Sequence, residues 1–143
     1  MLGLAFLAVM GASYPAGPYT LVIPDSWKVE LQGEGGGTSI LLAVSPKGDT
    51  VAVSHAEIPG FGLLGGFVKE DTYMDTYANG KPPEGCQKPP EKVEVNGHKV
   101  LFYTCEKGAI TAVCAPDMKA ILTLVAHGPS PKEAILEILR GSL

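Results

Sequence analysis

The side chains of this 143-residue chain that most readily bind metals or move protons are three histidines, His55, His98 and His127. Ser54 and His55 are the residue types of a nucleophile and its base, but neighbours on a strand point to opposite faces of a sheet and do not pair. His98 opens one expected strand and His127 ends another that runs in the same direction, so the two lie at opposite ends of the sheet. The chain has no histidine–carboxylate motif at helical spacing. We therefore expect no metal site.

A glycine-rich run from Gly33 to Gly37 invites comparison with phosphate-binding loops. It lacks the Gly-Lys-Ser/Thr ending that brings positive charge to a phosphate. It also lacks the third glycine, at fixed spacing and opening a helix, of a dinucleotide-binding fingerprint. Residues from Ser39 open an expected strand instead. The run is interpreted as a flexible hairpin loop, and we expect no cofactor.

Carboxylates supply one candidate cation site. Asp71 and Asp75 lie one turn apart on an expected helix, with Glu70 beside them. A solvated acidic helix face is the commoner meaning of such a pattern. No carboxylate pair stands out for acid–base catalysis, and no Gly-x-Ser-x-Gly nucleophile elbow occurs. These observations favour a protein that is not an enzyme and has no catalytic residue.

The three cysteines, Cys86, Cys105 and Cys114, lack the spacing of metal ligands and are too few for a disulfide scaffold. On the expected sheet Cys105 and Cys114 lie about 13 Å apart at ~3.3 Å per residue, beyond the Cα separation of roughly 7 Å that a disulfide tolerates. Continuing the preceding strand ladder backwards brings Cys86 within one step of Cys105. In an oxidising compartment we expect a Cys86–Cys105 disulfide and a buried free thiol at Cys114. Three reduced cysteines are the alternative.

The stretch from Lys92 to His127 contains two of the histidines and two of the cysteines, and its pattern predicts a four-strand antiparallel meander. Asn96-Gly97 indicates a type I′ turn, because that pair tolerates the positive φ that the turn needs. Lys107-Gly108 indicates a second turn. The last strand, 120–126, is apolar on both sides, which predicts a place in the middle of the sheet with cover over both faces.

The two turns set the expected register of the meander. Period-two alternation then gathers the apolar core on one face. The expected partners are Val95 and His98, Val93 and Val100, Lys92 and Leu101, Glu106 and Ala109, Thr104 and Thr111, and Phe102 and Val113; the expected core face is Val93, Val95, Val100, Phe102 and Val113.

Further elements flank the meander. Alternating apolar residues predict strands at 19–23, 27–31, 39–44 and 50–57, with Trp27 as a core anchor. A period of 3.6 predicts a helix within 61–77 that ends at Asn79-Gly80. Ser130, Pro131 and Glu133 form a capping box for a C-terminal helix that Gly141 ends.

Residues 1–10 contain no charge and no polar side chain. They are too few to span a bilayer as a helix, which takes ~20 residues, and they lack the basic start and the cleavage site of a good secretory signal. An exposed apolar arm is unfavourable, so it is expected to pack as a strand on its own sheet or to add to the sheet of a neighbouring subunit; a retained signal remnant is the third alternative. Residues 13–18 are interpreted as a Pro/Gly linker, which gives an arm and linker at 1–18 and a single domain at 19–143. The apolar positions of the arm are Leu2, Leu4, Phe6, Leu7, Val9 and Met10.

Composition narrows the classes of function. A formal charge of −4 without clustered Lys and Arg argues against a nucleic-acid partner. Eighteen Gly and twelve Pro favour a turn-rich β fold over a helical bundle. The length suits one domain. Low charge and high hydrophobic content suit a secreted, cell-surface or envelope protein, or one that buries surface in an assembly.

The succession of elements resembles the PsbP-like superfamily of small α/β/α sandwiches. The resemblance covers Tyr19 to Leu143 and is carried by GPYTLVIPDSWKVE, a hairpin, a helix, VEVNGHKVLFYTCEKGAITAVCAPDMKAILTLVA and a terminal helix. That superfamily includes luminal extrinsic subunits of photosystem II, bacterial envelope lipoproteins and a nuclear-transport cofactor, which mostly act by binding. The chain lacks the lipobox cysteine of the lipoproteins, and no functional residue is carried over. The resemblance implies an α+β fold, an antiparallel sheet with two helices packed on it as an α/β/α sandwich, to which residues 1–10 add an apolar strand.

The function expected from these observations is structural. The protein is expected to be a non-catalytic secreted or cell-surface assembly protein whose arm packs into a neighbouring subunit, donor-strand fashion, and builds a homopolymer or filament. It has no expected transmembrane span. The alternative is a monomeric PsbP-like accessory or ligand-binding envelope protein with the arm packed on its own sheet.

Overall fold

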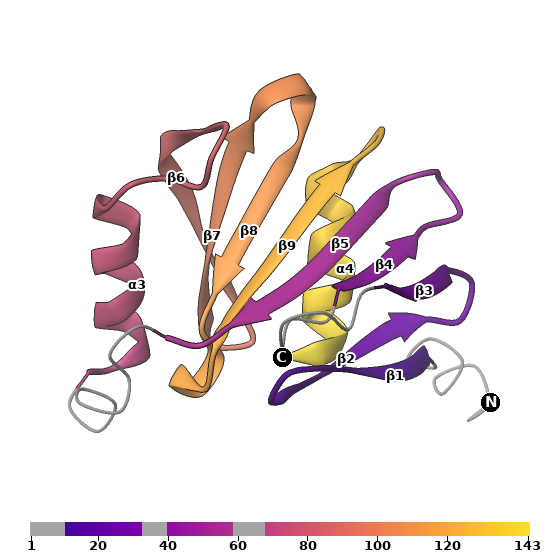
Figure 1. The fold of residues 1–143 in the computed structure, drawn as a ribbon, viewed down its shortest axis with the longest axis horizontal. Coiled ribbons are helices and arrows are strands. Elements are labelled where there is room, and N and C mark those ends of the chain that lie inside the picture. The colour runs from indigo at the N-terminus through magenta and orange to yellow at the C-terminus, as the bar shows by residue number, and fades with distance from the viewer. Residues whose placement is uncertain (1–10, 33–39, 59–67) are drawn as a thin grey trace.

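The computed structural model describes residues 11–32, 40–58 and 68–143. Within them, seven antiparallel strands form one open sheet in the order β3-β4-β5-β9-β8-β7-β6, and β1 and β2 form a separate hairpin (Figure 1). Two α-helices and two short 3₁₀ turns complete the described chain. The bounds are β1 Gly11–Ala16, β2 Tyr19–Pro24, β3 Lys28–Gln32, β4 Ile40–Val44, β5 Thr50–Ala56, α3 Glu70–Asn79, β6 Cys86–Val95, β7 His98–Cys105, η1 Glu106–Gly108, β8 Ile110–Cys114, η2 Pro116–Met118, β9 Ile121–His127 and α4 Pro131–Ser142.

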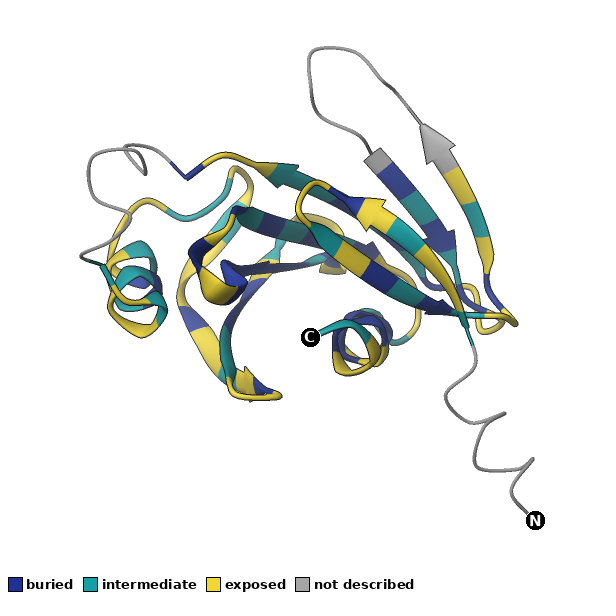
Figure 2. Ribbon diagram, turned by 90° about the horizontal axis from the view of Figure 1, so that it is seen from below, coloured by how far each residue is buried: buried dark blue, intermediate teal, exposed yellow. Residues whose placement is uncertain are grey.

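The inner face of the sheet packs on α4 and carries the larger core. Alternation along each strand sends one apolar row inward, and in Figure 2 the sheet arches over α4. The β1–β2 hairpin contributes Leu21 and Ile23 to the same core. The inner row crosses five neighbouring strands in register as Leu41, Val53, Leu124, Ala112 and Phe102, and it clusters with Ile135, Ile138 and Leu139 of α4.

The outer face is covered only in part, and this makes the expected α/β/α sandwich wrong. α3 packs over β6 and β7, where Met74 clusters with Leu101 and Tyr103. A helix with its side chains is about 10 Å wide, or roughly two strands at ~4.8 Å spacing, so one helix does not cover seven strands. Over β9, Thr123 and Val125 stay half-buried, and no other helix of the described chain covers this face. The fold is β-rich: an open antiparallel sheet with two helices.

The first turn of the meander follows the prediction and the second does not. Asn96-Gly97 has φ of 50° and 85°, and β6 pairs with β7 in the expected register. At the second turn η1 makes a three-residue connection with Lys107 at φ 60°. The β7–β8 ladder therefore shifts by one residue, and Phe102 lies opposite Ala112 rather than Val113. Val113 joins the outer cluster below α3, so its predicted place on the inner core face is wrong.

The residues before β2 also differ from the expectation. Residues 13–18, interpreted as a linker, form most of β1 and the turn to β2, and β1 pairs with β2 along its whole length. The turn lies close to the sheet, because an added Cβ at Gly17 would be 2.6 Å from His55 Nδ1. Gly17 also has φ of 63°, where glycine is favoured.

Residues 1–10, 33–39 and 59–67 lie outside the described chain. The predicted arm, the glycine-rich loop and much of the helix predicted within 61–77 therefore lie outside it as well. Of the described part of that helix, Val68 and Lys69 are not helical and α3 begins at Glu70. Trp27 is buried, as predicted. No helix among the described residues has both the length and the apolar character to cross a membrane.

Candidate functional site

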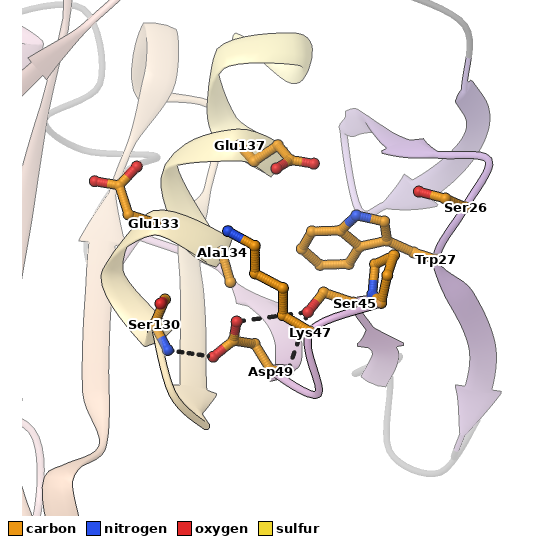
Figure 3. Close-up of a pocket in the computed structure, with 10 residues that line it drawn as sticks. Ser26, Trp27, Ser45, Lys47, Asp49, Ser130, Glu133, Ala134 and Glu137 are labelled. Carbon is orange, nitrogen blue, oxygen red and sulfur yellow. Dashed lines mark hydrogen bonds between the residues drawn. The ribbon is translucent and has the colours of Figure 1, made fainter.

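A pocket of about 250 Å³ lies between the β2–β3 turn, the β4–β5 turn and the first half of α4 (Figure 3). We call it the Trp27 pocket. Its three contributing segments are far apart in the sequence. Its walls combine the indole of Trp27, the hydroxyls of Ser26, Ser45 and Ser130, the carboxylates of Asp49, Glu133 and Glu137, and the ammonium of Lys47.

Asp49 holds the base of the Trp27 pocket together. It is 2% exposed. Its Oδ1 accepts a hydrogen bond from the backbone N–H of Ser130 at 2.7 Å, and its own backbone N–H donates to Ser45 Oγ at 3.0 Å. Negative charge is favourable at a helix N-terminus, so the β4–β5 turn caps α4. Ser130 makes no side-chain cap of its own, which corrects the capping box predicted with Glu133.

The mouth of the pocket is negatively charged. Glu133 and Glu137 lie one helical turn apart on α4 and are exposed. Lys47 reaches the pocket from the β4–β5 turn and forms no ion pair with another residue in the described part of the chain. Together with Asp49, three carboxylates against one lysine leave a formal charge of −2 around the indole of Trp27. An aromatic ring beside carboxylates suits a cation.

A second group, the His98 cluster of Glu70, His98 and Asp117, lies at the opposite end of the sheet. There α3 begins, β7 begins and η2 joins β8 to β9. His98 Nδ1 lies 2.9 and 3.1 Å from the two carboxylate oxygens of Glu70. The ligand-capable atoms of all three side chains lie within 4.8 Å of one another. The side chains of His98 and Glu70 are each 19% exposed, so the group is sheltered but reachable.

Backbone geometry places Asp117 beside Glu70. The Asp117 N–H donates to Glu70 Oε1 at 2.8 Å. Asp117 and Met118 both have φ of 56°, a left-handed conformation that is unfavourable in residues other than glycine. Tyr19 secures the same loop: its hydroxyl accepts a hydrogen bond from the Ala120 N–H at 3.0 Å and lies 2.8 Å from two carbonyl oxygens of the loop. Burial raises the pKa of Tyr19 to about 12.

The other carboxylates of α3 are paired with lysines. Lys99 Nζ lies 2.7 Å from Asp75 Oδ1 and 2.9 Å from Asp71 Oδ1, and Lys92 Nζ lies 3.1 Å from Asp75 Oδ1. Hydrogen bonds from Lys99 and Lys92 lower the pKa of Asp75, and hydrogen bonds to Asp75 and Asp71 raise the pKa of Lys99. Asp71 and Asp75 therefore tie α3 to β6 and β7 instead of forming the cation site considered from the sequence.

The predicted disulfide between Cys86 and Cys105 is present. The two cysteines lie directly opposite each other because β6 carries an irregularity within residues 87–91, which the predicted ladder did not include. The disulfide borders a groove of about 360 Å³ that also reaches His127. Cys114 is buried and free, as predicted, and burial raises the pKa of its thiol to about 12.

Sequence reasoning missed the His98 cluster although part of it was deducible. The Asn96-Gly97 turn puts His98 at one end of the sheet, and the connection from β8 to β9 returns to that end, so the approach of Asp117 follows from the meander. The approach of Glu70 does not, because no pattern in the sequence says where α3 docks. The alternation of its strand favours Trp27 as a core anchor over an exposed binding residue, and its pocket partners are not visible as a pattern because they come from distant segments.

A scan against protein-family models finds no match to this chain, and a search of curated proteins finds none either. The Trp27 pocket is a concave, negatively charged surface with an aromatic wall, whereas the His98 cluster is a compact set of ligand atoms. Each arrangement suits a different kind of ligand.

Proposed function

We propose that the protein is a non-catalytic binding protein that holds a compact cationic group, a primary amine or a guanidinium, in the Trp27 pocket. The supporting observation is the composition of the pocket: an indole beside three carboxylates and one lysine. Such cations are attracted by aromatic rings and form strong hydrogen bonds to carboxylates. The volume of about 250 Å³ lies just under the ~300 Å³ of the smallest usual ligand sites, which suits a side chain or small amine better than a large metabolite.

The pocket is built to keep its shape without a ligand. Asp49 is committed to Ser130, which leaves Glu133 and Glu137 to meet the cation. Trp27 is 7% exposed and belongs to the inner core, so its ring is held in place. A preformed pocket avoids the entropic cost of ordering side chains on binding. A binding role is also what the PsbP-like resemblance implies, and that resemblance stays a prediction.

An oxidising compartment is part of the proposal. The Cys86–Cys105 disulfide supports it, because disulfides persist in secreted, envelope and cell-surface proteins and are rare in a reducing cytosol. Alkylation under denaturing, non-reducing conditions tests it on protein taken from its native cells. One modified thiol, at Cys114, is expected. Three modified thiols would mean that the protein resides in a reducing compartment.

Fluorescence titration tests the binding proposal directly, because Trp27 is the only tryptophan of the chain. Agmatine and arginine amide should give a saturable change in emission, whereas acetate and glucose should give none. The double substitution Glu133→Gln with Glu137→Gln should weaken amine binding about tenfold or more, since two charges are lost. Lys47→Ala should tighten it, because a competing cation is removed.

Glu94→Gln is the matched control for the pocket glutamates. Like each of the two pocket substitutions, it removes one negative charge, here from an exposed position on the edge strand β6, and it should leave the titration unchanged. The proposal fails if agmatine gives no saturable signal, or if the Glu133→Gln, Glu137→Gln double variant binds as well as the control.

Assembly through residues 1–10 is the second candidate, because one edge of the sheet formed by the described residues could accept a further strand. Among the described residues β3 pairs only with β4, so its other side offers free backbone groups to a further strand. The opposite edge strand, β6, carries Pro89 and Pro90 and exposed charged side chains, which discourage strand addition. An uncharged segment such as 1–10 of a neighbouring copy fits the open edge and would yield a homopolymer.

Sedimentation velocity tests this assembly. The parent chain should form large species, and a variant with Leu4→Lys and Leu7→Lys should sediment as a monomer, because charges oppose burial of the segment. Thr20→Lys with Thr72→Lys, at two exposed positions, adds the same charge elsewhere and should assemble like the parent. Identical sedimentation of the parent and the Leu4→Lys, Leu7→Lys variant would exclude this route.

A further inference from the structure

We propose that Glu70, His98 and Asp117 bind a divalent transition-metal ion of the zinc class. This site lies at the other end of the sheet from the Trp27 pocket and does not depend on the amine-binding proposal. Its donor set is one imidazole and two carboxylates, which are nitrogen and oxygen ligands that zinc accepts. The ligand-capable atoms of the three side chains lie within 4.8 Å of one another.

The distances within the cluster suit a shared ion. His98 Nδ1 and Glu70 Oε2 are 2.9 Å apart. Two ligand atoms that each lie ~2.1 Å from a zinc ion are about 3.0 Å apart when the ligand–zinc–ligand angle is a right angle and about 3.4 Å apart when it is tetrahedral. A small outward movement of His98 and Glu70 would therefore make room for the ion. The ion would replace the direct contact between His98 Nδ1 and the Glu70 carboxylate. Asp117 is exposed, so the solvent side keeps a position for water, as in an open zinc site.

Charge balance favours the ion as well. Glu70 and Asp117 bring two carboxylates to one imidazole, and a dication neutralises both. Lys99, next to His98 in the sequence, is already paired with Asp71 and Asp75. The Asp117 backbone, held by its hydrogen bond to Glu70, keeps the two acidic residues together even without a cation.

An ion at this place would join three separate elements. Glu70 belongs to α3, His98 to β7 and Asp117 to η2. The expected effect is therefore on stability: an ion that binds the folded state and not the unfolded chain raises the melting temperature, and the rise grows with the logarithm of the ion concentration divided by its Kd. Hydrogen exchange of the α3 amides should slow when the ion binds, since the ion anchors the start of that helix.

Asp117→Asn is the decisive variant. In the described structure the Asp117 side chain makes no hydrogen bond or ion pair, and only its backbone N–H holds Glu70. The substitution therefore removes one charged ligand and leaves the His98–Glu70 contact in place. Chelator-treated protein is titrated with zinc chloride by isothermal calorimetry and by thermal shift. One zinc per chain is expected, with an affinity loss of about tenfold or more in Asp117→Asn.

His127→Ala is the matched control, because His127 is an exposed histidine at the far end of the sheet. It should bind zinc like the parent, whereas His98→Ala should lose the site. Cobalt(II) provides a second readout: its visible absorption should change between the parent and Asp117→Asn. Unchanged zinc affinity in Asp117→Asn, or an equal loss in His127→Ala, would overturn the proposal. Amine titration at Trp27 is unaffected by either result, so the two proposals fail separately.

Discussion

Asp49 and Ser130 lie 81 residues apart in the sequence and are joined by a hydrogen bond of 2.7 Å from the Ser130 backbone N–H to Asp49 Oδ1. Through this bond a turn between two strands caps the C-terminal helix. Gly128 permits the close approach, because it has φ of 135° and a Cβ there would collide with Asp49. One buried carboxylate thus sets both the start of α4 and one wall of the Trp27 pocket.

Asp49→Ala should lower the free energy of unfolding by about 2 kcal/mol, because it removes the cap of α4 and leaves the Ser130 N–H without its acceptor. Asp49→Asn retains an acceptor oxygen and should cost less. Urea unfolding followed by circular dichroism measures both. Asp25→Ala, at an exposed turn, is the control and should stay within about 0.5 kcal/mol of the parent. Equal losses in Asp49→Ala and Asp25→Ala would show that α4 does not need this cap.

Reduction of the Cys86–Cys105 disulfide should lower the free energy of unfolding by about 3 kcal/mol. The bond spans 19 residues, and this is the stabilisation expected when a loop of that length is closed in the unfolded chain. Guanidinium titrations with and without a thiol reductant measure the difference. The Cys86→Ser, Cys105→Ser double variant should be less stable than the parent and indifferent to the reductant. A reductant effect that persists in the double variant would point to another cause.

Stability should fall as the pH rises above about 9. Burial raises the pKa of Cys114 from 9.0 to about 12, and it raises the pKa of Tyr19 and Tyr103 from 10.0 to about 12. The folded state therefore keeps these protons where the unfolded chain releases them. The stability linked to them is complete below the ordinary pKa values and is lost as the pH rises towards 12.

Urea midpoints measured at a series of pH values from neutral upwards test this alkaline loss. Cys114→Ala is less stable at neutral pH because it leaves a small gap in the core, but its decline above pH 9 should be shallower than that of the parent. A flat profile for the parent, or parallel profiles for the two proteins, would contradict the assignment of the loss to buried thiol and phenol groups.

Tyr19→Phe should destabilise the protein by about 1 to 3 kcal/mol, because the Ala120 N–H loses its acceptor. The loop that carries Asp117 should then exchange its amide hydrogens faster, and zinc affinity should drop with it. Tyr14→Phe removes a hydroxyl from a half-buried tyrosine that makes no side-chain hydrogen bond to another described residue, and it should be close to neutral. Similar behaviour of both variants would show that the loop does not rely on Tyr19.

Features with a local cause were predictable from the sequence. Asn96-Gly97 forms its turn because the two residues tolerate positive φ. The Cys86–Cys105 disulfide and the buried thiol at Cys114 followed from strand pairing, although the irregularity within residues 87–91 was not anticipated. The C-terminal helix was predicted from its first turn, and it runs one residue beyond Gly141.

Features that depend on distant residues were not predictable. At η1, Lys107 adopts φ of 60° without any residue that signals it, and the ladder slips by one. The apolar strand at 120–126 predicts that both faces of the sheet are covered. Its pattern does not say how many neighbouring strands one helix is wide enough to cover. Asp49 reaching Ser130 and Glu70 reaching His98 are tertiary contacts, so neither the cap nor the His98 cluster was visible as a pattern.

Among the described strands the two borders of the main sheet are unlike, since β3 pairs with β4 alone and β6 is obstructed by Pro89 and Pro90. Growth by strand exchange at β3 would therefore be head-to-tail, with a direction and with chemically different ends. A copy stripped of residues 1–10 would accept a strand and donate none. Added in small amounts, it would act as a terminator, and average filament length would fall as its fraction rises.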